Sequence, residues 1–194
     1  MEKISYALGV NIAGSFKREG IKDVDFASFS KGFRDVMEEN VLDITLDEAN
    51  QLLQEFFTEM EAKKQNENIE VGIAFLAENA KRPGVVSMAS GLQYEVLVNG
   101  TGSKPSATDK VKCHYHGTLI DGTVFDSSVQ RGTPAVFPVN GVIAGWVEAL
   151  QLMNTGSKWK LFIPSTLAYG AHGAGQHIGP HTTLVFEVEL IEIV

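Results

Sequence analysis

The stretch Lys110-Val-Lys-Cys-His-Tyr-His-Gly-Thr-Leu119-Ile-Asp-Gly-Thr-Val-Phe125 decides the fold of the second half of the chain. Along its first ten residues apolar and polar side chains alternate, the pattern of a β-strand with one buried face. The Asp121-Gly122 pair follows at once and is typical of the two-residue turn that joins antiparallel strands. The stretch therefore predicts a β-hairpin.

The same period of two recurs on both sides of this hairpin and is interrupted by only one short helical pattern, at 142–150. Strands with a single helix indicate an α+β domain in which an antiparallel sheet covers that helix. The segment 169–182 has no periodicity and holds four glycines and one proline, so we expect a long surface loop with a functional role. Strands are predicted at 92–98, 110–119, 123–125, 136–139, 158–163 and 183–193.

The first eighty residues have helical periodicity throughout. We expect the first helix to end at Gly20, and the second to begin after Asp25 as N-cap and to end near Asn40. Thr45 and Glu48 have the spacing of a capping box at the start of a third helix. This helix runs to about residue 80, before Arg82-Pro83-Gly84.

The third helix is unusually long, and its middle, residues 63–68, has no apolar face. A helix that is polar all round usually crosses solvent between two packed ends, and we expect Gly72 to weaken it. The apolar residues before this point predict an all-α dimerisation module at 1–60, a linking helix at 61–82 and a second domain at 83–194. The alternative is a monomeric helical cap folded against the second domain.

Composition and charge exclude several classes of protein. The chain has 194 residues, 44% apolar and 21% charged, as is usual for a globular protein. Its formal net charge of −8 lies entirely in residues 1–80, and no region has the basic excess that nucleic-acid binding requires. No segment is apolar for long enough to span a membrane. The start lacks a signal-peptide pattern, so we expect a cytoplasmic protein, or a periplasmic one if a leader was trimmed.

Conventional catalytic motifs are absent from the sequence. The lone Cys113 is expected to be a buried structural thiol, because alternation places it towards the core. The glycine-rich stretch 170–175 is not followed by the lysine of a phosphate-binding loop. The histidines have no zinc-ligand spacing, and we expect neither a metal nor a cofactor. These histidines are His114, His116, His172, His177 and His181.

The remaining candidates are aromatic residues at strand ends, on the short helix and at the start of the long loop. A concave aromatic pocket with a few polar groups is the general form of a small-ligand or peptide site. Asp126 and Arg131 follow Phe125 closely and are expected to form an ion pair at the rim of this pocket. The aromatic candidates are Tyr115, Phe125, Phe137, Trp146, Tyr169 and Phe186, with Val142, Ile143 and Ile178 beside them.

Several motifs together closely resemble the FKBP-type peptidyl-prolyl cis-trans isomerases, over about residues 90–194. The helical front end resembles that of the dimeric bacterial subgroup related to the macrophage infectivity potentiator. The motifs occur in order as Val111-Lys-Cys-His-Tyr115-His-Gly117, Asp121-Gly-Thr-Val-Phe125-Asp126-Ser127-Ser128, Val139-Asn-Gly-Val142-Ile143-Ala-Gly-Trp146, Ile163-Pro164, Leu167-Ala-Tyr169-Gly170 and Leu184-Val-Phe186-Glu-Val-Glu-Leu190.

The resemblance implies a half-open antiparallel sheet wrapped over the short helix and a proline pocket with Trp146 as its floor. It implies that Asp126 lies at the pocket edge and that the Tyr169 hydroxyl and the Ile143 backbone N–H contact the bound peptide. It also implies that macrolides such as tacrolimus and rapamycin bind there. The walls would be Tyr115, Phe125, Val142, Ile143, Tyr169 and Phe186, with Phe137 nearby and Ile178 in the loop.

The sequence departs from the family pattern at three places. Gly179-Pro180 stands where the family often has Pro-Pro, which we expect to loosen the loop. Ala135 replaces a pocket aromatic of some members, and His116 replaces a frequent threonine.

The expected activity is the non-covalent rotation of X–Pro bonds in proline-containing peptides and unfolded protein clients, by a homodimer formed through residues 1–60. The alternative is a chaperone or adaptor that docks proline motifs with little turnover.

Overall fold

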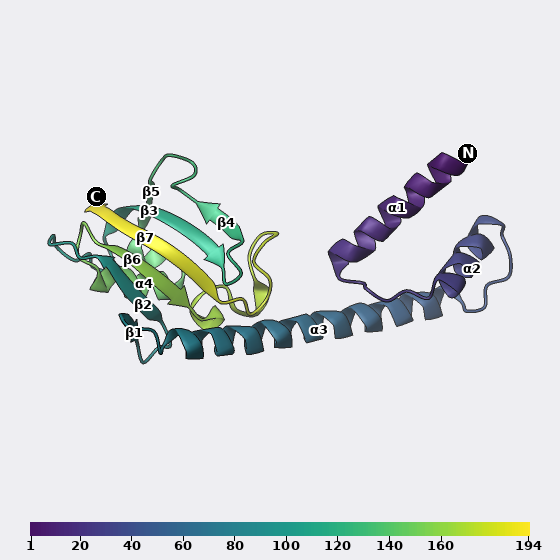
Figure 1. Cartoon of the computed structure of the whole chain (residues 1–194), viewed down its shortest axis with the longest axis horizontal. Helices are drawn as coiled ribbons and strands as arrows, with labels where there is room; N and C mark the ends of the chain where they lie inside the picture. Colours follow the sequence, from purple (N-terminus) through teal and green to yellow (C-terminus); the bar gives the residue numbers. More distant parts are fainter. The chain divides into compact units, whose positions relative to one another are not determined.

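The computed structural model describes all residues from 1 to 194, and they form two compact units, Met1–Phe56 and Phe57–Val194. Figure 1 shows the helices of the first unit and the sheet of the second, with the helix α3 passing from one unit into the other. None of the helices is both long and apolar enough to cross a membrane.

The first unit begins with the two predicted helices. Helix α1 (Glu2–Glu19) ends at Gly20, whose φ of 86° is the left-handed conformation that glycine adopts without steric cost. Helix α2 (Phe26–Met37) begins at Asp25, whose carboxylate accepts the Ser28 N–H at 2.7 Å. Helix α2 ends at Met37, three residues before the predicted end near Asn40.

Helix α3 (Leu46–Asn79) has the predicted capping box. The Thr45 hydroxyl accepts the Glu48 N–H at 3.1 Å, and the Glu48 carboxylate accepts the Thr45 N–H at 2.8 Å. The helix runs without a break through its polar middle and through Gly72.

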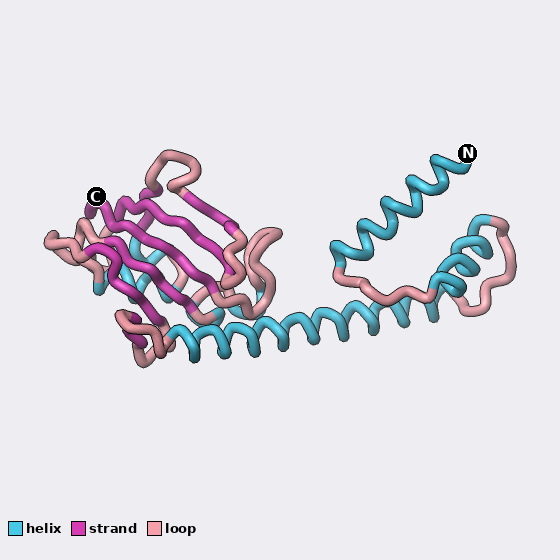
Figure 2. The backbone as a smooth tube through the Cα atoms, in the orientation of Figure 1, coloured by secondary structure: helices cyan, strands magenta, loops and turns pink.

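The second unit contains a single antiparallel sheet with the strand order β1-β2-β6-β7-β3-β4, and β5 also pairs with β3 (Figure 2). The predicted strands are present with small shifts at their ends, and the short β1 was not predicted from the sequence. The strands are β1 (Val85–Ser87), β2 (Gln93–Val98), β3 (Lys110–Leu119), β4 (Val124–Ser127), β5 (Ala135–Pro138), β6 (Lys158–Ile163) and β7 (Leu184–Ile193).

The short helix α4 (Ala144–Leu152) packs against the sheet and contributes to its hydrophobic core. Trp146, Ala149 and Leu150 are buried on it. Helix and sheet approach closely because Gly145 has no side chain: a Cβ there would lie 2.6 Å from Ile163. The α+β fold expected from the strand pattern is thereby confirmed. Three short 3₁₀ helices complete the unit, at Val139–Gly141, Ser165–Leu167 and Gly170–His172.

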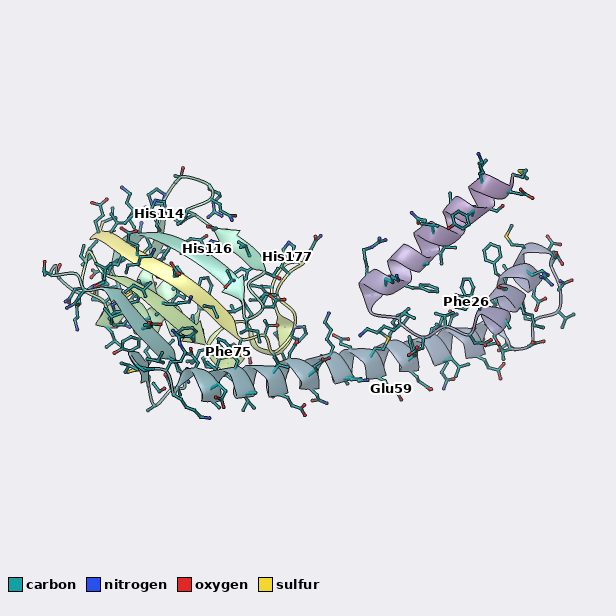
Figure 3. All side chains as sticks on the ribbon, viewed as in Figure 1. Phe26, Glu59, Phe75, His114, His116 and His177 are labelled. Carbon is teal, nitrogen blue, oxygen red and sulfur yellow. The ribbon has the colours of Figure 1, made fainter.

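The last turns of α3 pack on the sheet of the second unit. The rings of Phe75 and Phe162 lie 6.0 Å apart between centroids. The side chain of Gln93 donates to the Leu76 carbonyl at 2.9 Å and accepts from the buried Asn79 amide at 2.8 Å. Figure 3 shows Phe75 on the part of α3 nearest the strands. This end of the helix is therefore part of the second unit.

Candidate functional site

Trp146 forms the floor of an aromatic cluster. It lies in the first turn of α4, where only 4% of its surface is exposed. Three other rings meet its ring in tilted or edge-to-face contacts that favour aromatic pairs. The centroid separations are 5.5 Å to Tyr115, 5.4 Å to Phe137 and 5.2 Å to Phe186.

A cavity of about 670 Å³ opens over this cluster. The structure brings together around it residues from β3, β4, β5, α4, the long loop and β7. From the predicted site set, all but Arg131 line the cavity: Tyr115, Phe125, Asp126, Phe137, Val142, Ile143, Trp146, Tyr169, Ile178 and Phe186.

Asp126 is the centre of the polar edge of the cavity. Its Oδ2 accepts the Tyr115 hydroxyl at 2.5 Å, and its Oδ1 pairs with the Arg131 guanidinium. Arg131 also donates to the Tyr115 oxygen at 2.8 Å, and its guanidinium carbon lies 5.6 Å from the centre of the Tyr115 ring. Arg131 therefore stands beside the cavity and holds two residues that line it.

These contacts shift the pKa values of Asp126 and Tyr115 at the edge of the cavity. Burial acts to raise the pKa of Asp126, but the hydrogen bonds from Tyr115 and Arg131 outweigh it and lower that pKa below 3.8. Burial, and then the hydrogen bond to Asp126, raise the pKa of Tyr115. At neutral pH the cavity edge thus carries a carboxylate, a phenol and a guanidinium in one closed triangle.

Two small residues that were not among the predicted site residues, Gly117 and Ser128, hold the aromatic walls in place. A Cβ on Gly117 would lie 2.7 Å from the Phe125 ring and 2.8 Å from the Phe186 ring. The buried Ser128 hydroxyl accepts the Tyr115 N–H at 2.7 Å and fixes the strand behind that ring. A glycine inside a strand is a signal for such a close approach and was available in the sequence.

Two groups at the cavity have no acceptor within the protein. One is the hydroxyl of Tyr169, whose side chain is 39% exposed, and the other is the backbone N–H of Ile143, just before α4. Both are free to donate to a ligand carbonyl. The indole N–H of the buried Trp146 also lacks a partner in the protein.

The cysteine and the two histidines on β3 do not line the cavity. Cys113 is fully buried, and burial raises the pKa of its thiol to about 12, so it stays protonated at neutral pH. His114 and His116 share hydrogen bonds with the hydroxyls of Ser128 and Ser127 at 3.1 and 2.9 Å. Figure 3 shows both histidines along β3 and His177 in the long loop. Of the five histidines, only His177 lines the cavity, together with Ala135, Gly141, Ala174, Gly175 and Gln176.

Comparison with protein families assigns both parts of the chain. Residues 101–191 match the family described as FKBP-type peptidyl-prolyl cis-trans isomerase. Residues 1–96 match the domain amino terminal to FKBP-type peptidyl-prolyl isomerase.

Curated relatives match along nearly the whole chain. The FKBP-type 22 kDa peptidyl-prolyl cis-trans isomerase of Escherichia coli is 46% identical over 97% of this chain and 93% of its own length. The outer membrane protein MIP of Legionella longbeachae is 44% identical over 99% of this chain and 85% of its own. The crystal structure of FkpA from Escherichia coli matches with a TM-score of 0.83 at 34% identity, over 99% and 93% of the two chains.

The chain therefore belongs to the FKBP-type peptidyl-prolyl cis-trans isomerase family. The expected class of enzyme, an isomerase of X–Pro bonds that assists protein folding, is confirmed by these matches.

Proposed function

We propose that the aromatic cavity is where this chain isomerises X–Pro bonds, with Trp146 as floor and the rings of Tyr115, Phe125 and Phe186 as walls. The observation that carries the proposal is the cavity itself: it is lined by converging rings, yet has a charged triangle and two free donors at its edge. A prolyl ring needs an apolar hollow, and the adjacent carbonyls need donors.

The chemistry of the reaction explains this composition. Rotation about an X–Pro bond has a barrier of roughly 18–20 kcal/mol because the amide is conjugated. The amide twisted by about 90° has lost its conjugation and most of its charge separation, so a water-poor aromatic cavity favours it over the planar form. Catalysis is then preferential binding of the twisted form, and it needs no nucleophile or proton transfer.

The polar groups take positioning and binding roles in this mechanism. The Tyr169 hydroxyl and the Ile143 N–H bind substrate carbonyls, with the donors already in place before the amide rotates. Asp126 holds Tyr115 and Arg131 in position and does not act as a base, because no proton is removed. Phe137, Val142 and Ile178 supply the apolar contacts with the proline and its neighbours.

A coupled isomerisation assay with Leu-Pro and Phe-Pro tetrapeptides tests the proposal. We expect turnover by the full chain and a loss of at least about tenfold in Val142→Asp, which places a charge in the apolar cavity. Val98→Asp, at a position 51% exposed on β2, is the matched control and should keep full activity. Binding of the peptides without turnover would instead favour a docking module.

The same cavity should bind macrolides such as tacrolimus or rapamycin, as the resemblance to the family implies. Ala135 lines the cavity with a small side chain and leaves more room on that wall. Competitive inhibition of the tetrapeptide assay by either macrolide would support this proposal, and the absence of inhibition at saturating drug would contradict it.

A homodimer formed through residues 1–60 is proposed from the surface of the first unit. No residue of α1 or α2 is buried, although α2 carries Phe26 at 78%, Phe33 at 54% and Met37 at 69% exposure. A contiguous apolar surface of this kind marks a protein interface, and a second copy presents the same surface in return. Equilibrium sedimentation at micromolar concentration tests for twice the chain mass of 21.1 kDa.

Two prolyl sites in one dimer should hold an unfolded client at two points and raise its apparent affinity.

Location in the cell envelope is proposed because a relative 44% identical over 99% of this chain is named an outer membrane protein. The comparisons lend no support to the cytoplasmic expectation. Fractionation of cells expressing the natural gene would decide between the two compartments.

A further inference from the structure

Helix α3 contacts the long loop that precedes β7, although the two are far apart in the sequence (Figure 1). The side-chain amide of Asn68 donates to the Pro180 carbonyl at 2.8 Å, across a separation of 112 residues. Because a carbonyl oxygen only accepts hydrogen bonds, the nitrogen of the Asn68 amide must face it. The bond therefore fixes both the position and the orientation of this side chain.

The chain on either side of Pro180 is held against the same helix. The Thr182 hydroxyl donates to the Gly179 carbonyl at 2.8 Å, which closes the backbone around Pro180. Thr183 is buried where Gly72 of α3 leaves room for it, since a Cβ on that glycine would lie 2.4 Å from the Thr183 hydroxyl oxygen. The return arm of the loop, residues 179–183, thus rests on α3.

Backbone hydrogen bonds tie the rest of the loop to this arm. Ala174 and Ile178 exchange two backbone hydrogen bonds at 2.8 and 3.2 Å, and the His181 N–H donates to the Gly170 carbonyl at 2.7 Å. Ile178, the residue just before the arm, is only 8% exposed and lines the aromatic cavity. A displacement of Pro180 is therefore passed to a wall of the site.

We propose that Asn68 is a positioning residue of the prolyl site: from α3, it holds the loop so that Ile178 closes the cavity. Asn68 does not line the cavity and acts through Pro180. The inference rests on the proposed function, in which that cavity receives the substrate proline. Under this proposal the C-terminal half of α3 contributes to the substrate site of the isomerase unit.

The expected kinetic effect follows from where Ile178 lies. Its side chain touches the substrate in both the planar and the twisted form of the amide, so losing its position weakens binding of both equally. Such uniform loss raises KM and leaves kcat nearly unchanged. One neutral hydrogen bond corresponds to a factor of about two- to tenfold in KM.

The experiment compares Asn68→Ala with Asn66→Ala in the full chain. Asn66 is exposed on the same helix and its side chain makes no hydrogen bond, so both variants gain the same helix propensity and differ only in the loop contact. We measure KM and kcat with the Leu-Pro tetrapeptide, and deuterium uptake of residues 170–182. Asn68→Asp, which replaces the donor by a carboxylate facing the Pro180 carbonyl, is the third variant.

We expect KM to rise about two- to tenfold in Asn68→Ala and further in Asn68→Asp, with faster uptake in 170–182 and no change in Asn66→Ala. Unchanged KM in Asn68→Ala, or an equal effect in Asn66→Ala, would overturn the proposal. A fall in kcat at unchanged KM would overturn it too. Deuterium uptake does not depend on turnover, so an inactive wild-type chain would count against the proposed function, whereas unchanged uptake in Asn68→Ala would count against the role of Asn68.

Discussion

The hydroxyl of Tyr115 donates to the carboxylate of Asp126 at 2.5 Å, and the guanidinium of Arg131 binds both partners. The three groups come from β3, β4 and the turn after β4, and they form one polar edge of the cavity over Trp146. We therefore expect the carboxylate to order the site without taking part in proton transfer.

Removing the carboxylate should weaken catalysis without abolishing it. For Asp126→Ala we expect kcat/KM to fall about five- to tenfold, since a hydrogen bond to a charged group contributes about 1.5–3 kcal/mol when buried and less at an exposed rim. The tetrapeptide assay measures the loss. Asp121→Asn, in the β3–β4 turn, is the control and should be fully active, because asparagine keeps the oxygen that accepts the Thr123 N–H. Unchanged kcat/KM in Asp126→Ala would show that the triangle does not order the site.

The same carboxylate predicts a pH dependence of stability. The pKa of Asp126 is lower in the folded chain than its usual value of 3.8, so its stabilising contribution is complete above pH 3.8 and is lost as pH falls through the lower folded pKa. The difference in Tm between wild type and Asp126→Asn should thus be constant from pH 7 to about pH 5 and shrink below pH 3.8. A difference that stayed constant down to pH 2.5 would contradict the ionised pairing.

The Tyr169 hydroxyl should contribute one substrate hydrogen bond. For Tyr169→Phe we expect a loss in kcat/KM of less than about tenfold, or ~1.4 kcal/mol, with unchanged Tm because the hydroxyl has no partner within the protein. Tyr6→Phe, on the first unit and 77% exposed, is the matched control. A loss of several orders of magnitude would indicate chemistry beyond binding.

Gly72 should resist substitution although it lies in a helix. Gly→Ala in an exposed helix stabilises by about 1 kcal/mol, but here the added Cβ would lie 2.4 Å from the Thr183 hydroxyl oxygen. We expect Gly72→Ala to lower the free energy of unfolding by about 1–3 kcal/mol, as overpacking does. Thermal unfolding of Gly72→Ala, Thr183→Ala and the double variant measures the coupling. A double variant less stable than the sum of the two single effects would exclude this clash as the cause.

Removing the first unit should separate peptide catalysis from client folding. Residues 57–194 form a compact unit and should keep kcat/KM on tetrapeptides within about twofold of the full chain, while refolding of a proline-limited protein slows. A shorter fragment that begins at residue 81 loses Phe75 and Asn79 from the sheet and should unfold at a lower temperature. Equal refolding by 57–194 and the full chain would contradict the bivalent mechanism.

The sequence by itself determined the local elements, because these depend on neighbours in the chain. The β3–β4 hairpin follows from alternation and Asp121-Gly122, the start of α3 from Thr45 and Glu48, and the end of α1 from Gly20. The aromatic candidates were also visible, because they lie at strand ends, on the short helix and at the start of the long loop, and the family motifs contain most of them.

The tertiary structure alone decided how distant residues meet. No pattern in the sequence indicates that Asn68 contacts Pro180, or that Gly72 is needed for contact with Thr183, since each pair joins segments more than a hundred residues apart. Gly72, which was expected to weaken the helix, thus allows Thr183 to approach it closely. Which residues share a cavity depends on strand order and register, and these are set by packing of the whole sheet on α4 rather than by any local preference.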